Sequence, residues 1–292
     1  MSSNNRRSFL QSMAVSGFAA GVGMSHNAYA TVDAPIHAAN LNPAGDIYID
    51  PRKVLLYECT RREIRERLQS GELKAAIIPT GATEQHNEHM AMIMDTAGSL
   101  LISQQVALML YPQVIVTTPI PIGISPYWMN RKGTLTLRRE VFLDVVYDIC
   151  DSLKTHGIKT ILIVNGHGGN AQPISEVLPD FVSKLGIKIE SCSYWDSIPK
   201  EMTRTFLEQG SVPGHADEME TCIALAAFPE RIRYQGVDFD KALASVTDEN
   251  ERKGLMDRGG FEQSKCATPE KGERIIAHAT KWVAEKLQGM IG

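Results

Sequence analysis

The sequence lacks an excess of positive charge, a cysteine framework and any long apolar run. Its 30 Lys and Arg residues stand against 34 Asp and Glu residues, so it has no basic footprint, and we expect no nucleic-acid partner. It has no linker rich in Pro, Ser or Gly and no internal repeat, which favours one large domain over two. The remaining composition, 43% hydrophobic and 22% charged among 292 residues, is typical of a globular protein with a sizeable core.

The cysteines are few, widely spaced and odd in number, which argues against a disulfide framework. They include no Cys-x-x-Cys pair, which argues against a thiolate metal site. We therefore expect small buried apolar side chains, and a single bridge in an oxidising compartment stays open as an alternative. The five residues are Cys59, Cys150, Cys192, Cys222 and Cys266.

The first thirty residues differ in composition from the rest of the chain. Arg6 and Arg7 precede a short apolar stretch that is broken by glycines, and Ala-Tyr-Ala at 28–30 offers a cleavage site. This pattern is typical of a twin-arginine export signal, so we predict a signal peptide at 1–30 and a mature domain at 31–292 without a membrane span. The protein would then be exported folded by the twin-arginine machinery and be periplasmic or secreted. The alternative is a disordered basic tail.

Short apolar runs alternate with helical patterns along the mature chain. This alternation predicts an α/β fold, a single-domain three-layer sandwich with a mainly parallel central sheet flanked by helices. The predicted strands are 74–80, 113–120, 159–166 and 187–195. The predicted helices are 60–71, 95–110, 139–157, 173–185 and 270–288, and a further helix starts near 217.

Three polar loops follow predicted strands, and ligands of such sheets bind beyond the carboxyl ends of the strands. In the first loop, "PTGATEQHNEHM", Glu84 and His86 are spaced to share one face of an extended chain. Asp95 follows at the start of a helix, where it could bridge two cations, and His167 lies between glycines in "NGHGGN". Carboxylates and imidazoles without sulfur suit Zn²⁺, Mn²⁺ or Fe²⁺. Each residue alone could equally be a polar loop residue, and "NGHGGN" alone a phosphate-binding loop or a tight turn.

Taken together, the motifs resemble those of the creatininase family of metal-dependent amidohydrolases. The shared pattern is E-x-H-x-x-H with an Asp eleven residues after the Glu, then N-G-H-G-G-N, then H-x-x-x-x-E-T, and it covers most of residues 50–230. In this chain the positions are Glu84, His86, His89, Asp95, 165–170, His215, Glu220 and Thr221.

The resemblance implies two divalent ions, Zn²⁺ and/or Mn²⁺ with Fe²⁺ as a further option. Glu84, Asp95 and His167 would hold one ion, and His86 with the bridging Asp95 the other. A metal-bridging hydroxide would attack the amide carbonyl. His215 would face the substrate as a catalytic residue and protonate the leaving nitrogen. Family members are commonly homohexamers, so we expect a homo-oligomer.

Two departures from the family pattern concern the metal site and the first loop. Creatininase itself has a Glu that completes the second metal site where this chain has Gly169, and we hypothesise that Glu220 supplies the missing carboxylate in addition to a catalytic role. The first motif has Asn87-Glu88 where the family commonly has Gly-Pro. Glu88 could alter the charge at the cleft mouth or simply be solvated.

The third departure is the loop 123–137, where we expect substrate selection. Tyr127 and Trp128 could stack on a planar ring, and Arg131 or the adjacent Lys132 could hold a carboxylate. Exposure of these cations to solvent is an equal alternative. Trp195 is a further candidate for a pocket wall, or else a core aromatic residue.

The sequence therefore predicts a hydrolase that cleaves a C–N bond of a small cyclic amide or lactam, with creatinine itself not favoured. One alternative is a deformylase or another acyclic amide hydrolase on the same scaffold. A second is a non-catalytic periplasmic metal-binding or accessory protein.

Overall fold

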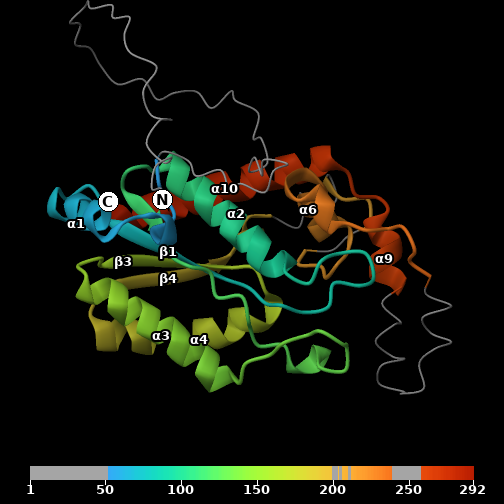
Figure 1. Ribbon diagram of the computed structural model, residues 1–292, viewed down its shortest axis with the longest axis horizontal. Helices are drawn as coiled ribbons and strands as arrows, with labels where there is room; N and C mark the ends of the chain where they lie inside the picture. Colours follow the sequence, from blue (N-terminus) through green and yellow to red (C-terminus); the bar gives the residue numbers. More distant parts are fainter. Residues whose placement is uncertain (1–51, 199–202, 204–205, 210–211, 239–257) are drawn as a thin grey trace, which may run out of the picture. The chain divides into compact units, whose positions relative to one another are not determined.

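A computed structural model of the chain describes residues 52–198, 203, 206–209, 212–238 and 258–292 (Figure 1). All of these belong to one compact unit. The predicted signal peptide at 1–30 lies outside the described residues. Among the residues described, no helix combines the length and the apolar character needed to cross a membrane.

Four parallel strands form the central sheet, in the order β2-β1-β3-β4. The register pairs Thr80 with Asn165 and Asn165 with Ser193, so three strands end side by side. Only the second strand is much shorter than predicted, because the chain beyond Val116 contains Pro119 and Pro121, which have no amide hydrogen for a sheet ladder. The bounds are β1 Ala75–Thr80, β2 Val114–Val116, β3 Thr160–Asn165 and β4 Lys188–Ser193.

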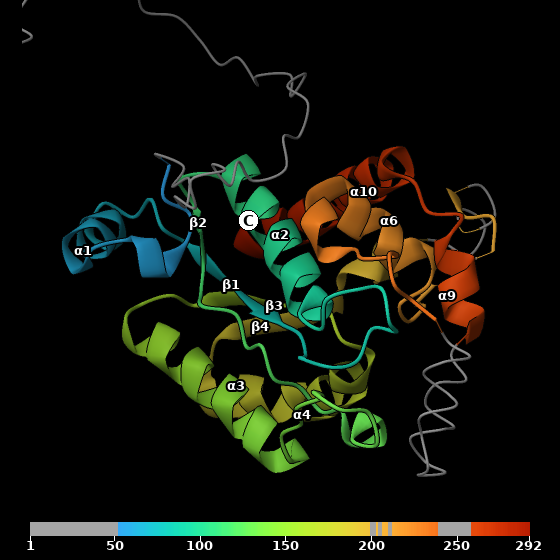
Figure 2. The same cartoon turned by 45° about the vertical axis from the view of Figure 1, so that its right-hand side comes forward.

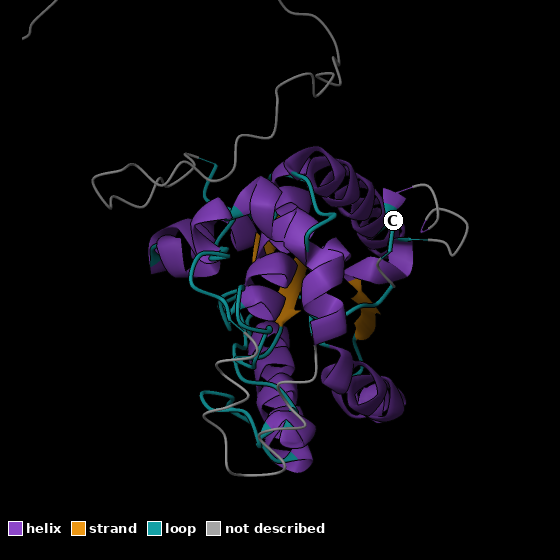
Figure 3. Cartoon of the chain, turned by 90° about the vertical axis from the view of Figure 1, so that its right-hand side faces the viewer, coloured by secondary structure: helices purple, strands orange, loops and turns teal. Residues whose placement is uncertain are grey.

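Helices cover both faces of the sheet, which confirms the predicted α/β sandwich (Figures 1 and 2). Alternate residues of each strand serve two separate cores, as the pleat of a strand requires. Ile77 belongs to the core that includes residues of α2, α6 and α10, whereas Ile78 belongs to the core that includes residues of α3 and α4. Figure 3 shows the strands enclosed by these helices. Their bounds are α2 Met94–Met109, α3 Arg139–Thr155, α4 Gly168–Leu185, α6 Glu218–Ala227 and α10 Pro269–Ile291.

The remaining elements are short and lie outside the two helical layers or at their ends. The helix α1 begins after a capping box in which Thr60 and Glu63 satisfy each other's main-chain amides. All five cysteines are free. Cys150, Cys192 and Cys222 are buried as predicted, whereas Cys59 and Cys266 are only partly buried. The other bounds are α1 Arg61–Gln69, α9 Arg258–Ser264, η1 Leu56–Glu58, η2 Pro126–Trp128, η3 Tyr194–Ser197 and η4 Pro229–Arg231.

Candidate metal centre

The side chain of Asn165 shapes the turn that carries His167. It is buried at the end of β3, accepts hydrogen bonds from Thr80 Oγ1 (3.0 Å) and from the main-chain amide of His167 (3.1 Å), and donates to the His167 carbonyl (2.7 Å). The main-chain amide and the carbonyl of His167 are thus both bonded to the Asn165 side chain. The helix α4 begins at Gly168, earlier than predicted. His167 is held rigidly at the carboxyl edge of the sheet.

A close approach of two main chains brings this turn to the second helix. A Cβ atom at Gly166 would collide with the carbonyl oxygen of Asp95 and would lie 3.0 Å from Ser99 Cβ. Only glycine fits there, so the β3–α4 turn can rest on the first turn of α2. As a result, His167 and Asp95 become neighbours although they are far apart in the sequence.

The first candidate group consists of Glu84, Asp95 and His167, whose potential ligand atoms lie within 4.8 Å of one another. His167 Nδ1 is 3.0 Å from Asp95 Oδ2 and 3.3 Å from Glu84 Oε1. All three side chains are buried, at 3% exposure or less. They come from three different elements: the loop after β1, the start of α2 and the turn after β3.

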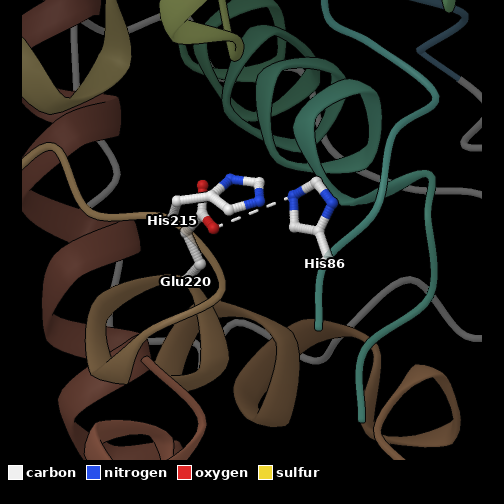
Figure 4. Close-up of side chains that lie close together, drawn as sticks. All are labelled: His86, His215 and Glu220. Carbon is white, nitrogen blue, oxygen red and sulfur yellow. Dashed lines mark ion pairs between the residues drawn. The ribbon is translucent and has the colours of Figure 1, made fainter. Parts of the chain in front are cut away.

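The second candidate group consists of His86, His215 and Glu220 (Figure 4). His86 Nε2 is 2.9 Å from Asp95 Oδ1 and 3.8 Å from Glu220 Oε2. The carboxylate of Asp95 thus presents one oxygen to His86 and the other to His167. This arrangement is what a residue shared between two metal ions requires.

Hydrogen bonds to main-chain carbonyls orient the imidazoles of His86 and His167. His86 Nδ1 lies 3.0 Å from the Glu84 carbonyl, and His167 Nε2 lies 3.1 Å from the Ile124 carbonyl. A carbonyl can only accept, so each ring donates there, and its other nitrogen faces the carboxylates, where it could give a lone pair to a metal ion once its proton is lost. A histidine that ligates a metal typically donates its other ring N–H to a carbonyl or carboxylate in this way.

Two buried carboxylate oxygens of the first group, Glu84 Oε2 and Asp95 Oδ2, have no hydrogen-bond donor among the described residues. Asp95 Oδ2 lies 3.0 Å from His167 Nδ1, yet the pair does not meet hydrogen-bond geometry. Buried carboxylate oxygens and an imidazole nitrogen that converge on one point fit a divalent cation. The residues present therefore match the predicted metal ions.

Without a metal, protons take the place of the positive charge. Burial lowers the pKa of His86, but the Asp95 carboxylate outweighs burial and raises it to about 10. The pKa of His167 also reaches about 10, because burial is outweighed by the Asp95 carboxylate, 3.0 Å from its Nδ1. Burial raises the pKa of Glu220 to about 8. The cluster consequently holds extra protons near neutral pH, and a metal ion would displace them.

His215 lies at the mouth of the centre, with 26% of its side chain exposed. Its Nδ1 is 3.6 Å from Glu84 Oε1, and its ring stacks on Trp128 at 4.8 Å between centroids. Burial, reinforced by the proximity of His86, lowers the pKa of His215 to about 3. The imidazole is therefore neutral, unlike those of His86 and His167.

The loop 123–137 closes over this mouth. Tyr127 is 54% exposed, but its hydroxyl lies 3.2 Å from His167 Nε2. The guanidinium carbon of Arg131 lies 4.1 Å from the centre of the Trp128 ring. The structure thus brings Tyr127, Trp128 and Arg131 to the site, with Trp128 packed against His215 and Arg131. Lys132 is exposed.

The structure places Trp195 in the core and does not bring it to the metal centre. It is 7% exposed and contacts Tyr194 edge-on at 5.0 Å. Trp195 is thus a core aromatic residue at a strand end, and it also lines a pocket beside α4 and β4 whose lining includes none of the proposed metal ligands. His89 is also buried, and its Nε2 lies 3.1 Å from Thr221 Oγ1, so it ties the first loop to α6.

Gly169 cannot carry the carboxylate that creatininase has at this position without rearrangement of the loop. A Cβ atom there would lie 2.5 Å from the Tyr127 hydroxyl and 2.6 Å from His167 Nε2, and would collide with the Ile124 carbonyl. The two departures at Gly169 and Tyr127 are therefore coupled, because the tyrosine fills the space beside the glycine. Glu220 Oε2 lies 3.8 Å from His86 Nε2, which is compatible with the hypothesis that Glu220 supplies the missing carboxylate.

We expect Gly169→Ala to lower the free energy of unfolding by about 1–3 kcal/mol, since the methyl group would overpack the site. Gly168→Ala is the matched control, because a Cβ atom at Gly168 meets nothing within 4 Å. In the first turn of α4 this control should be neutral or stabilising by up to about 1 kcal/mol. Thermal unfolding of the two variants measures the difference, and equal melting temperatures would contradict the steric assignment.

Two residues that were not among the predicted site residues also shape the site. Gln85 contacts His215, and Asn87 adopts a φ of 54° in the left-handed region. Asn87 had a signal in the sequence, because Asn tolerates the left-handed region better than most residues and replaces the family's glycine there. Gln85 had no such signal, because its partner His215 is 130 positions away.

Comparisons with known proteins point to one family. A sequence model of a family described as creatininase, creatinine amidohydrolase, matches residues 57–287. The chain is 30% identical to a 3-dehydro-scyllo-inosose hydrolase of Thermotoga maritima over 62% of its own length and 58% of that protein, which is less than two thirds of it. It is 26% identical to creatinine amidohydrolase of Pseudomonas putida over 81% of its own length and 97% of that protein.

Solved structures share the fold. A crystal structure of creatinine amidohydrolase superimposes with a TM-score of 0.67 at 23% identity, over 82% of this chain and 98% of that one. Similar structures are described as a creatininase of Zn-Zn type and as creatininase Mn, so members of the family have been solved with either metal.

Proposed function

The chain belongs to the creatininase family of metal-dependent hydrolases acting on C–N bonds, and we propose that it opens a small cyclic amide or lactam. The observation that carries the proposal is the Asp95 carboxylate, which presents one oxygen to each of two histidines whose other nitrogens donate to carbonyls. Two residue groups that share one carboxylate suit a centre of two metals.

Glu84, Asp95 and His167 would hold one ion. Asp95, His86 and Glu220 would hold the other. Zn²⁺ and Mn²⁺ both suit this donor set of carboxylates and imidazoles. When bound, such ions polarise a carbonyl group and lower the pKa of a water molecule.

The other residues of the site would bind and orient the substrate. Trp128 lies against His215, which narrows the mouth and favours a compact substrate. Arg131 lies beside the indole and could contact an anionic substituent of the substrate. His215, partly exposed between Trp128 and Glu84, would contact the reacting group.

The test starts with the metal content of the purified protein, followed by assays with added Zn²⁺ or Mn²⁺ and with a chelator. The substrate panel would contain cyclic amides and lactams, N-formyl amides and, because of the Thermotoga relative, an inosose, with products read by mass. Hydrolysis of a cyclic amide that is lost on chelation and restored by metal would support the proposal. Cleavage restricted to formyl amides would favour the deformylase alternative. A protein that binds metal and hydrolyses nothing in the panel would favour a non-catalytic metal-binding protein.

We also propose that the protein is exported through the twin-arginine route and assembles into a homo-oligomer. Export rests on Arg6, Arg7 and the Ala-Tyr-Ala sequence at 28–30. An intact mass that begins after Ala30 in a periplasmic or secreted fraction would support it. Retention of residues 1–30 would oppose it. The oligomeric state can be read from the mass measured by light scattering.

A further inference from the structure

Gln85 makes the closest polar contact of His215. The side-chain nitrogen Nε2 of Gln85 lies 2.7 Å from His215 Nε2, and Gln85 is buried at 9% exposure. The chain folds the first loop back so that the main-chain amide of Asn87 donates to Gln85 Oε1 at 3.0 Å. A main-chain amide can only donate, so this bond assigns the oxygen of the Gln85 amide to Asn87 and its NH₂ group to His215.

The orientation of Gln85 is held from several sides. Asn87, which donates to Gln85, has a left-handed backbone conformation. Its side chain donates to the Ala216 carbonyl at 3.3 Å. The main-chain amide of Gln85 donates to Thr134 Oγ1 at 3.1 Å. The first loop is thereby tied both to the residue after His215 and to the loop 123–137. Reversing the Gln85 amide would break the bond from Asn87 and place an oxygen against His215.

An NH₂ group that donates to His215 Nε2 requires a lone pair on that nitrogen. A neutral imidazole then carries its only proton on Nδ1. In a cationic imidazole Nε2 would also carry a proton, so two donor groups would face each other. Nδ1 is the nitrogen that faces Glu84 Oε1 and the interior of the site. His215 therefore differs from His86 and His167, whose inward nitrogens face Asp95 and would give lone pairs to metal ions, because their outward nitrogens donate to carbonyls.

We infer that Gln85 is a positioning residue that directs the ring proton of His215 onto Nδ1, so that His215 is a hydrogen-bond donor to the reacting group and not a metal ligand. The inference rests on the proposed function and revises one part of it. Complete transfer of the Nδ1 proton would leave an anionic imidazole, so His215 would keep its proton and stabilise developing negative charge on oxygen. It would not be the acid that protonates the leaving nitrogen.

The first experiment reads the tautomer directly and needs no substrate. Long-range ¹H–¹⁵N spectra of metal-free protein with ¹⁵N-labelled histidine, with His215 assigned by its loss in His215→Asn, should show the proton on Nδ1. In Gln85→Glu the carboxylate can only accept, and the proton should move to Nε2. A wild-type proton on Nε2, or an unchanged tautomer in Gln85→Glu, would overturn the inference.

The second experiment measures the metal content of a variant that lacks the His215 imidazole and therefore its Nδ1. His215→Ala should bind as many ions as the wild type. Loss of one ion would make His215 a ligand and overturn the inference. A wild type that binds no metal would count against the proposed function alone, because the tautomer is measured without metal.

The third experiment uses whichever substrate the panel identifies. Gln85→Glu should lower kcat about 100-fold with KM changed by less than about threefold, as expected when a donor to a developing charge is lost. Gln85→Met, which removes the bond without adding charge, should lower kcat less. Gln69→Glu, at an exposed position of α1, controls for the added charge. Equal losses of melting temperature and kcat in both Gln85 variants, with the tautomer unchanged, would show a merely structural role.

Discussion

Replacing Asp95 with Ala is expected to remove both metal ions and to lower kcat/KM by at least about 10³-fold. A loss of that size corresponds to about 4 kcal/mol of transition-state stabilisation. The reason is geometric, because Asp95 Oδ1 lies 2.9 Å from His86 Nε2 and Asp95 Oδ2 lies 3.0 Å from His167 Nδ1. No other described carboxylate contacts both histidines. Metal analysis of the purified variant, together with activity at saturating metal, measures the effect.

Two further variants make this result interpretable. Asp144→Ala removes an exposed carboxylate from α3 and should change neither metal content nor activity. Glu220→Ala should lose only one ion, because Glu220 contacts His86 and not His167. Retention of both ions in Asp95→Ala would refute the shared-ligand assignment. An unchanged content of two ions in Glu220→Ala would remove Glu220 from the second site.

Replacing Lys271 with Met is expected to lower the free energy of unfolding by about 3–5 kcal/mol, the usual cost of removing one partner of a buried ion pair. Lys271 Nζ in α10 lies 2.7 Å from Glu218 Oε1 and 2.8 Å from Glu208 Oε1. The Glu218 side chain is fully buried at the start of α6. Burial lowers the pKa of Lys271, but its bonds to the two carboxylates outweigh burial and hold the pKa above its usual value. The buried carboxylate would lose this ammonium partner in the variant.

The matched control is Lys281→Met on the same helix. Lys281 pairs with Glu285 at 3.9 Å, and both side chains are well exposed, at 73% and 65%. Exposed pairs of this type contribute about 0.3–0.5 kcal/mol, so the control should unfold nearly as the wild type does. Urea unfolding of the three proteins supplies the free energies. If the free energy of unfolding of Lys271→Met were within about 1 kcal/mol of that of the control, the Lys271–Glu218 pair would not stabilise the α6–α10 contact as proposed.

The Lys271 pair also bears on the site. Glu218 accepts main-chain hydrogen bonds from Glu208 and Gln209, so it anchors the segment that leads toward His215. Glu220 lies two residues further along the same helix, and its carboxylate accepts from the Ala216 amide at 2.5 Å. We therefore expect Lys271→Met to weaken metal binding as well.

Much of the fold followed from local patterns. Short apolar runs separated by helical periodicities predicted the parallel sheet, because strands buried on both faces need apolar residues at every position. The burial of all six residues of β1 bears this out. The convergence of Glu84, Asp95 and His167 was also predictable, since parallel strands bring their carboxyl ends to one edge.

The sequence by itself determined which faces are buried, which loops meet and which ligand types they carry, because these depend on periodicity and strand direction. Only the tertiary structure decided how the loops contact one another. The proximity of Tyr127 to His167, the core position of Trp195 and the bond from Gln85 to His215 join distant residues. Such contacts depend on the exact packing of adjacent turns, for which a single sequence contains no periodic signal. The first loop therefore supplies more than metal ligands, because its Gln85 fixes the proton of a histidine from another loop.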